Sequence, residues 1–199
     1  MKKFIVSVIL MTGCLIFVKA QSRFPLLDKS PMDMSYYPAN YPILRIQDKV
    51  TEPLLARLIY SRPQRNGRNV FGELLEYNKV WRLGANEATE IEFFQDVMIN
   101  GKVIAKGKYT MYAIPAEEKW TMILNKETDI WGAFKYESDK DVVRMDVPVQ
   151  KQTEPLEAFT MFFEKAPAGF VLTAAWDNAL VSLPVMPYEK PVKKSTKKK

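Results

Sequence analysis

From residue 54 onward, apolar and polar residues alternate along most of the chain with a period of two. This period is typical of strands that bury one face, because successive side chains of a strand point to opposite sides. Three segments, residues 54–62, 89–99 and 141–150, follow the pattern closely. Their apolar positions are Leu54, Ala56, Leu58 and Tyr60, then Ile91, Phe93, Val97 and Ile99, and then Val143, Met145, Val147 and Val149. The pattern predicts a fold built from strands, with these positions in its core.

Turn signals separate the predicted strands. Asn100-Gly101 favours a tight hairpin, because both residue types tolerate positive φ. The sequence Pro-Ala-Glu-Glu at residues 115–118 predicts a four-residue hairpin loop. Residues 158–185 are expected to form two consecutive hairpins, which turn at residues 167–169 and at Asp177-Asn178. Strands joined by such short turns indicate an antiparallel sheet.

Helical periodicity is weak throughout the predicted domain. The best candidates for helices are short, at residues 70–78 and 127–134. We therefore predict a single all-β domain, either an antiparallel β-sandwich or a flattened barrel, with short helical turns in its loops.

The first 20 residues have the layout of a secretory signal peptide. Two lysines precede an apolar run at residues 4–18, and a Val-Lys-Ala sequence then predicts cleavage after Ala20. A membrane anchor is one alternative, but the run is shorter than the ~20 residues of a typical spanning helix. A lipoprotein acylated at Cys14 is another, because Gly-Cys resembles a lipoprotein cleavage site. We expect an exported protein, periplasmic or secreted, with no transmembrane helix in the mature chain.

The remaining chain divides into three parts. Residues 21–50 contain four prolines, which predict an extended lead-in. Residues 51–187 carry the strand pattern and are expected to form the sandwich. Residues 188–199 are rich in lysine and are expected to be a disordered tail. The alternative role for this tail is weak attraction to an anionic envelope surface.

The formal net charge of the chain is +6, but the two ends carry it. Three lysines lie in the first 20 residues and five in the last seven, which leaves residues 21–192 with a net charge of −2. Nucleic-acid binding depends on clustered positive charge that neutralises phosphates. A nucleic acid is therefore not an expected partner.

The sequence contains no histidine, and Cys14 is its only cysteine. Ser-His-Asp and Cys-His catalysis are thus excluded, as are zinc sites built from these two residue types. Cleavage after Ala20 removes the cysteine, so the mature chain has no disulfide. Any catalysis must depend on carboxylate, lysine, tyrosine, arginine or hydroxyl side chains, and we expect no cofactor and no metal.

Residues 60–93 carry most of a family signature. They contain Tyr-Ser-Arg-Pro, Gly-Arg, Phe-Gly, Val-Trp-Arg and Gly-Ala-Asn-Glu, in that order. Similar residues continue at 107–126, 131–147 and 173–185. Over about residues 52–185, the chain resembles domain-of-unknown-function family 2911.

This resemblance implies a fold and a compartment. The family is common among exported proteins of Gram-negative bacteria of the Bacteroidota type, and it has no assigned activity. A shared fold does not by itself give a function. The resemblance therefore supports export and leaves the reaction or ligand open.

Arginines are concentrated in the signature, at Arg62, Arg68 and Arg82 among others. Guanidinium groups bind carboxylates and phosphates through two parallel hydrogen bonds. One interpretation is a pocket for an anion or a sugar acid. The other is that Arg62 and Arg82 pair with acids such as Glu87 or Asp141 and brace a long loop. We favour bracing, and we expect Arg82 to be paired and partly buried.

The sequence Gly-Ala-Asn-Glu-Ala-Thr at residues 84–89 predicts a tight corner before a strand. In that interpretation, the side chains of Asn86 and Glu87 form hydrogen bonds with nearby backbone groups. The alternative is that Glu87 faces a cleft as an acid or base, which requires a second catalytic group nearby.

Tryptophans occur in two kinds of position. Trp120 and Trp176 lie within predicted strands and are expected in the core, and Trp81 adjoins Arg82 in the signature. Trp131 lies in a loop, where it forms either a stacking platform for sugar rings or a plug at one end of the core.

These observations favour a non-catalytic binding or interaction domain of the cell envelope. Its partner is expected to be a glycan, a small anion or an envelope protein. The alternative is a hydrolase of envelope glycans that uses paired carboxylates, with Glu87 as its acid or base. Three alternating acids are interpreted as a solvated turn rather than a calcium site; they are Glu137, Asp139 and Asp141. The candidate ligand contacts are Arg62, Arg68, Trp81, Arg82, Asn86, Glu87 and Trp131.

Overall fold

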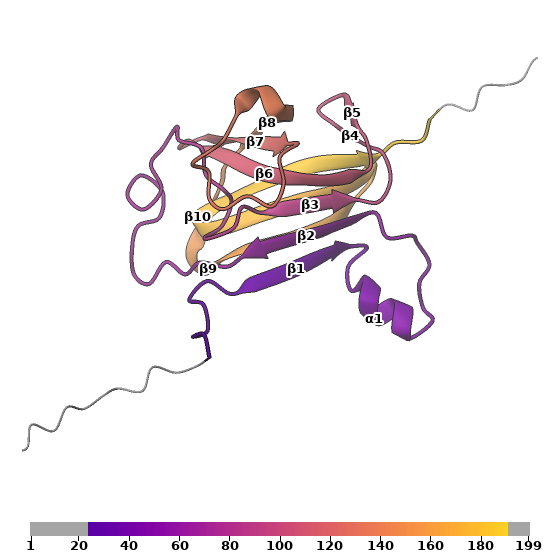
Figure 1. Ribbon diagram of the computed structural model, residues 1–199, viewed down its shortest axis with the longest axis horizontal. Helices are drawn as coiled ribbons and strands as arrows, with labels where there is room; N and C mark the ends of the chain where they lie inside the picture. The colour runs from indigo at the N-terminus through magenta and orange to yellow at the C-terminus, as the bar shows by residue number, and fades with distance from the viewer. Residues whose placement is uncertain (1–23, 191–199) are drawn as a thin grey trace, which may run out of the picture.

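A computed structural model describes residues 24–190, which form two antiparallel β-sheets packed against each other (Figure 1). The first sheet consists, in spatial order, of β1 (Met32–Tyr37), β2 (Ala56–Ser61), β3 (Glu90–Phe93), β6 (Gly107–Pro115), β7 (Lys119–Asn125) and β8 (Asp141–Pro148). The second consists of β5 (Lys102–Ile104), β4 (Val97–Ile99), β10 (Gly169–Pro187) and β9 (Gln150–Ala166). The sheets do not close into a barrel, so the prediction of an all-β sandwich is confirmed.

The core lies between the two sheets and follows the period-two pattern. Leu58 on β2 and Ile91 on β3 are fully buried on the inner face of the first sheet. They belong to one apolar cluster with Phe159 on β9 and Leu172 on β10. Burying one large apolar side chain contributes about 1.5–3 kcal/mol. Trp120 and Trp176 are buried in this core as predicted.

Residues 89–99 form two strands rather than one. The chain leaves the first sheet after Phe93 and enters the second sheet at Val97, and both of these side chains are buried between the sheets. The tight turn that joins β4 to β5 has φ values of 50° at Asn100 and 72° at Gly101, which confirms the predicted hairpin. The hairpin between β6 and β7 is also confirmed.

The strand β10 folds back on itself. An added Cβ atom at Gly169 would lie only 2.4 Å from the carbonyl oxygen of Val185, although the intervening residues of a straight strand would span roughly 50 Å. The reversal lies at Asp177, which has a φ of 51° and interrupts the register with β9. The hairpin predicted at Asp177-Asn178 therefore exists within β10, and the one at residues 167–169 joins β9 to β10.

The predicted boundary at residue 51 is wrong, because the first sheet already begins with β1. This strand pairs with β2 from Met32 opposite Ser61 to Tyr37 opposite Ala56. The lead-in also contains a helix, α1 (Tyr41–Ile46). A proline in its first turn is compatible with a helix, because the missing N–H would have no partner there.

The two helices predicted within loops do not form. Residues 70–78 and 127–134 contain turns, and the loop helix that does exist is the 3-10 turn η1 (Ser138–Lys140). At residues 70–78, Leu75 donates its backbone N–H to Val70, and this contact belongs to a compact loop rather than a helix.

Several predictions concern the two ends of the chain. The cleavage site at Ala20, the alternative acylation site at Cys14 and the tail beyond Lys190 lie outside the described residues. The first residues assigned to the tail are held in place by Asp96. Tyr188 donates its backbone N–H to the carbonyl of Asp96, and Lys190 forms an ion pair with the Asp96 carboxylate. No helix within residues 24–190 is long and apolar enough to cross a membrane.

Candidate functional site

The loop between β2 and β3, residues 62–89, lies at one end of the sandwich (Figure 1). Its first residues continue from β2 and form backbone hydrogen bonds with β9. The carbonyl of Pro63 accepts the N–H of Phe159 (2.9 Å), and Arg65 donates its N–H to the carbonyl of Glu157 (2.9 Å). Further along, Trp81 exchanges two backbone hydrogen bonds with Ala113 of β6 (2.7 and 2.9 Å). The loop is thus fixed to both sheets.

A cavity of about 290 Å³ lies against this loop, and we call it the Arg82 cleft. Among residues 24–190, two basic side chains and no acidic one line it. The rest of its lining is almost entirely apolar. Its residues are Ser30, Pro63, Arg68, Leu74, Leu75, Trp81, Arg82, Gly84, Ala85 and Trp176.

Two stacked indoles form the apolar floor of the cleft. The rings of Trp81 and Trp176 are 5.9 Å apart and inclined by 22°, and the two residues are only 4 and 2% exposed. Their Nε1–H groups donate to the carbonyl oxygens of Gly84 (3.0 Å) and Glu157 (3.1 Å). Because both indole N–H groups are used inside the protein, the floor offers no hydrogen-bond donor to a ligand.

Arg82 is half-buried in the cleft without a counter-charge. Its Nε atom is buried and has no hydrogen-bond partner, and no ion pair to this side chain exists within residues 24–190. Burial therefore lowers the pKa of the Arg82 guanidinium. The prediction that Arg82 pairs with an acid such as Glu87 or Asp141 is wrong. Glu87 is exposed, and the Asp141 carboxylate bonds to Arg144 instead.

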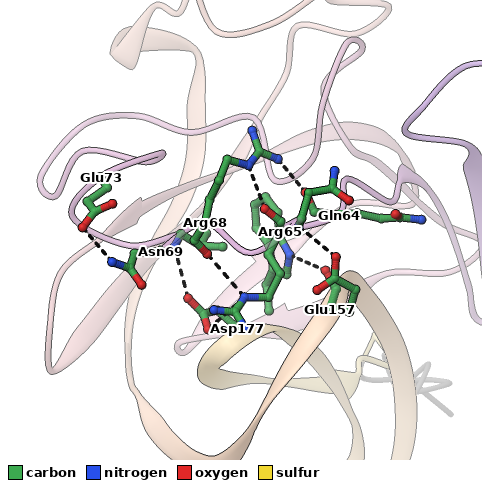
Figure 2. A network of polar contacts seen from close by, with 10 residues as sticks. Gln64, Arg65, Arg68, Asn69, Glu73, Glu157 and Asp177 are labelled. Atoms are coloured by element: carbon green, nitrogen blue, oxygen red, sulfur yellow. Dashed lines mark hydrogen bonds and ion pairs between the residues drawn. The ribbon is translucent and has the colours of Figure 1, made fainter.

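The neighbouring basic side chains are arranged differently (Figure 2). Arg68 turns back onto its own loop and donates from Nε to the carbonyl of Arg65 (2.7 Å) and from Nη2 to that of Gln64 (2.6 Å). Arg65 lies 3.6 Å from the Asp177 carboxylate, which also accepts the N–H of Val70 (3.1 Å). Arg68 thus brings a positive charge to the cleft, and its own loop uses two of its five N–H donors.

Arg62 does not line the cleft. It donates to the carbonyl of Phe159 (3.2 Å), to the carboxylate of Asp33 (3.0 Å) and to the hydroxyl of Thr160 (2.9 Å). These contacts tie the loop to β1 and β9, so Arg62 braces the loop as predicted. Its acidic partner is Asp33, not Glu87 or Asp141.

The backbone of the cleft wall is strained. Leu83 has a φ of 52°, in the left-handed region that costs most residues about 1–2 kcal/mol, whereas Asn86, with a φ of 60°, is of a type that tolerates it. Between them, Gly84 has a φ of 152°, and a Cβ atom there would lie 2.7 Å from the Ser61 hydroxyl. That hydroxyl holds the turn by bonding to both the N–H and the carbonyl of Ala85 (2.6 Å each). Strain of this kind is concentrated at functional sites.

The remaining candidates lie outside the Arg82 cleft. Asn86 donates its side-chain amide to the Asp28 carboxylate (3.0 Å). Glu87 forms a backbone bridge to Trp131, whose side chain is 61% exposed and does not plug the core. Glu87 also lines a separate cavity of about 130 Å³ with Met32, Ile59, Ala88, Glu90, Asp129 and Ile130.

The carboxylates beside Glu87 are bound to a lysine. Lys108 contacts Glu90 (3.1 Å) and Asp129 (2.9 Å), and Glu90 accepts the N–H of Asp129 (2.8 Å). The hydrogen bond from Lys108 is the main reason that the pKa of Asp129 is lowered. A catalytic acid needs the opposite shift, because it must hold a proton near neutral pH.

The acids of the predicted turn are occupied by protein groups. Glu137 pairs with Lys140 (2.9 Å), and the Asp141 carboxylate accepts hydrogen bonds from Asn125 (2.8 Å) and Tyr136 (2.6 Å). Burial, together with the hydrogen bond to Asp141, raises the pKa of Tyr136 to about 12. Within the described ranges, no group of three acids is placed to hold a metal ion.

Three of the ligand contacts predicted from the sequence, Arg68, Trp81 and Arg82, line the cleft, but the sequence does not predict the rest of its lining. The alternation places Trp176 in the core, and no motif in the sequence points to Leu74, Leu75 or Ser30. Trp176 lies 95 positions after Trp81, and no local pattern links two positions so far apart. Its place beside Trp81 depends on the pairing of distant strands.

Comparison with curated proteins and with solved structures gives no match. The sequence model of the family described as "Protein of unknown function (DUF2911)" matches residues 45–185, which is more than half of the chain. The matched region includes the loop at residues 62–89 and both sheets except for β1 and the last residues of β10. The chain therefore belongs to this family.

Proposed function

We propose that this protein is an exported, non-catalytic binding domain that holds a small anion in the Arg82 cleft. One observation carries the proposal: the Arg82 guanidinium lies half-buried in the cleft and has no partner among the described residues. Arg68 adds a second positive charge, and no acid of the described part of the chain lines the cleft. Asn86, Glu87, Arg62 and Trp131 are not part of this proposed site.

A bound anion would supply the partner that Arg82 lacks. A guanidinium removed from water without a counter-charge is destabilising, because no ion pair offsets its lost hydration. A hydrogen bond to a charged group contributes about 1.5–3 kcal/mol. Carboxylate and phosphate oxygens fit the guanidinium fork, so they are the expected anionic groups.

A glycan hydrolase with Glu87 as its acid or base is the rival function. Two carboxylates, Glu90 and Asp129, share the cavity with Glu87, but Lys108 holds both of them. That cavity, at about 130 Å³, is smaller than the ~300–1,000 Å³ of most small-molecule sites. Hydrolysis of an envelope glycan that disappears in the Glu87→Gln variant would overturn the non-catalytic part of the proposal.

Export rests on the first 20 residues, and a bacterial origin of the Bacteroidota type rests on the family resemblance. We expect cleavage after Ala20 and release into the periplasm or beyond the cell. Mass spectrometry of the mature protein tests this. An N-terminus at Gln21 is the expected result, whereas a lipid-modified Cys14 as first residue would mean attachment to a membrane.

Calorimetric titration of the purified protein with acetate, phenylacetate, glucuronate and phosphate tests the binding proposal. We expect saturable binding of at least one anion, weakened about tenfold or more in Arg82→Gln, because one charge-assisted hydrogen bond accounts for that factor. The matched control is Arg45→Gln, which removes an exposed charge on α1, at the opposite end of the sandwich (Figure 1). Equal weakening in both variants, or no binding in the wild type, would contradict the proposal.

A further inference from the structure

We infer that the Arg82 cleft selects a monocarboxylate with a compact apolar body, such as an aryl-substituted or branched aliphatic acid, over sugar acids and inorganic phosphate. This inference rests on the proposed function, because it assumes that the cleft binds an anion. It follows from the number of free donors in the cleft and from the chemistry of the walls around them.

Arg82 is the guanidinium in the cleft with the most donors to spare. Among the described residues, no side-chain hydrogen bond or ion pair involves Arg82, and because Nε is buried, the two Nη atoms are the ones that a ligand can reach. Arg68 already donates from Nε and Nη2 to the carbonyls of Arg65 and Gln64. A single fork of two N–H groups matches the two oxygens of one carboxylate. Phosphate carries more oxygens than this one fork can bind.

Most of the side chains around this fork are apolar. Pro63, Leu74 and Leu75 surround a floor of two indoles, Trp81 and Trp176. Both indole N–H groups are bonded to backbone carbonyls, so the small part of each ring that reaches the cleft is carbon surface. Leu74 is 40% exposed, and a ligand with an apolar body would cover it.

A sugar acid fits this lining poorly. Its ring carries several hydroxyl groups, and each one that enters the cleft needs a hydrogen-bond partner. Apart from the two arginines, the lining offers one polar side chain, that of Ser30. The cleft volume of about 290 Å³ also indicates a small ligand, since it lies at the lower end of the ~300–1,000 Å³ found for small-molecule sites.

The test compares dissociation constants at fixed ionic strength. The probes are phenylacetate, 4-methylpentanoate, glucuronate, phosphate and the neutral phenylacetamide. We expect the two apolar acids to bind at least about tenfold more tightly than glucuronate, phosphate and the amide, which is the scale of discrimination by an apolar pocket. In Leu74→Ser, phenylacetate should bind several-fold more weakly while acetate binds as in the wild type, because acetate is too short to cover this side chain.

The outcomes separate this inference from the proposed function. If glucuronate or phosphate binds as tightly as phenylacetate, and binding still depends on Arg82 in the Arg82→Gln comparison, the inference is wrong and the anion-binding function stands. If Leu74→Ser leaves phenylacetate affinity unchanged, the apolar body is not recognised and the inference is again wrong. If no probe binds in an Arg82-dependent way, both are wrong.

Discussion

Arg62 and Arg82 belong to one loop but differ in what surrounds their guanidinium groups. Each guanidinium nitrogen of Arg62 has a partner, in Phe159, Asp33 or Thr160. Arg82 forms no ion pair with any of the described acids. Asp33 lies 29 positions before Arg62 and Phe159 lies 97 after it. Because distant elements supply these partners, the residue type and its local sequence could not separate a bracing arginine from a binding one.

This contrast predicts opposite effects on stability. Arg62→Met should lower the free energy of unfolding by about 1–3 kcal/mol, because Phe159 and Asp33 lose a charged donor. The ion pair contributes the smaller part, since its side chains are 36 and 41% exposed. Arg82→Met, which keeps the length of the side chain and removes an unpaired charge, should leave stability within about 0.5 kcal/mol or raise it. Urea unfolding measures both, and an equal loss in the two variants would mean that Arg82 also braces the loop.

At the level of elements, the strands that bury a full face were predictable. The alternation in β2, β3 and β8 places their apolar side chains in the core without knowledge of their neighbours. The edge strand β1 was missed, because its sequence Met-Asp-Met-Ser-Tyr-Tyr buries only Tyr37 fully. The helix α1 was also missed, since six residues are too few to show a periodic apolar stripe.

The reversal inside β10 makes Gly169 a critical position. Its φ of 145° is nearly restricted to glycine, and a Cβ atom would lie 2.4 Å from the carbonyl oxygen of Val185. We expect Gly169→Ala to lower the free energy of unfolding by at least about 2 kcal/mol, from strain and overpacking together. The control is Gly101→Ala, where φ is 72° and nothing lies within 4 Å, so the loss should be only about 1 kcal/mol. Equal losses in thermal or urea unfolding would contradict the close approach of the two halves of β10.

At the scale of the whole molecule, the sequence predicted the sandwich but not the cleft. Strand positions depend on local alternation, whereas the cleft requires the loop that carries Trp81 and Arg82 to meet Trp176 of β10. The second cavity likewise depends on contacts between separate segments, because Glu87 and Glu90 line it together with Asp129. Local patterns predicted what is buried, and the contacts between distant segments decided which side chains share a site.

Tyrosine ionisation is expected to limit stability in alkali. Burial and Asp141 raise the pKa of Tyr136 to about 12 from an unfolded value of 10.0, so the folded protein holds this proton more tightly. Its contribution to stability is present below pH 10 and is lost as the pH rises from 10 to 12. We expect the free energy of unfolding to fall more steeply over this window in the wild type than in Tyr136→Phe. Urea unfolding at a series of pH values measures how the free energy of unfolding depends on pH in both proteins. Identical slopes between pH 10 and 12 would mean that the pKa of Tyr136 is not raised.

The central claim is that Arg82 is an unpaired cation that receives an anionic ligand. It is tested most directly by NMR of the nitrogen-15-labelled protein during titration with phenylacetate, observing the arginine Nε–H and tryptophan indole N–H signals. The account predicts saturable shifts for Arg82 and for the indoles of Trp81 and Trp176, with no shift for Arg62. An unchanged Arg82 signal at concentrations of phenylacetate that shift other residues, or no shift anywhere, would contradict it.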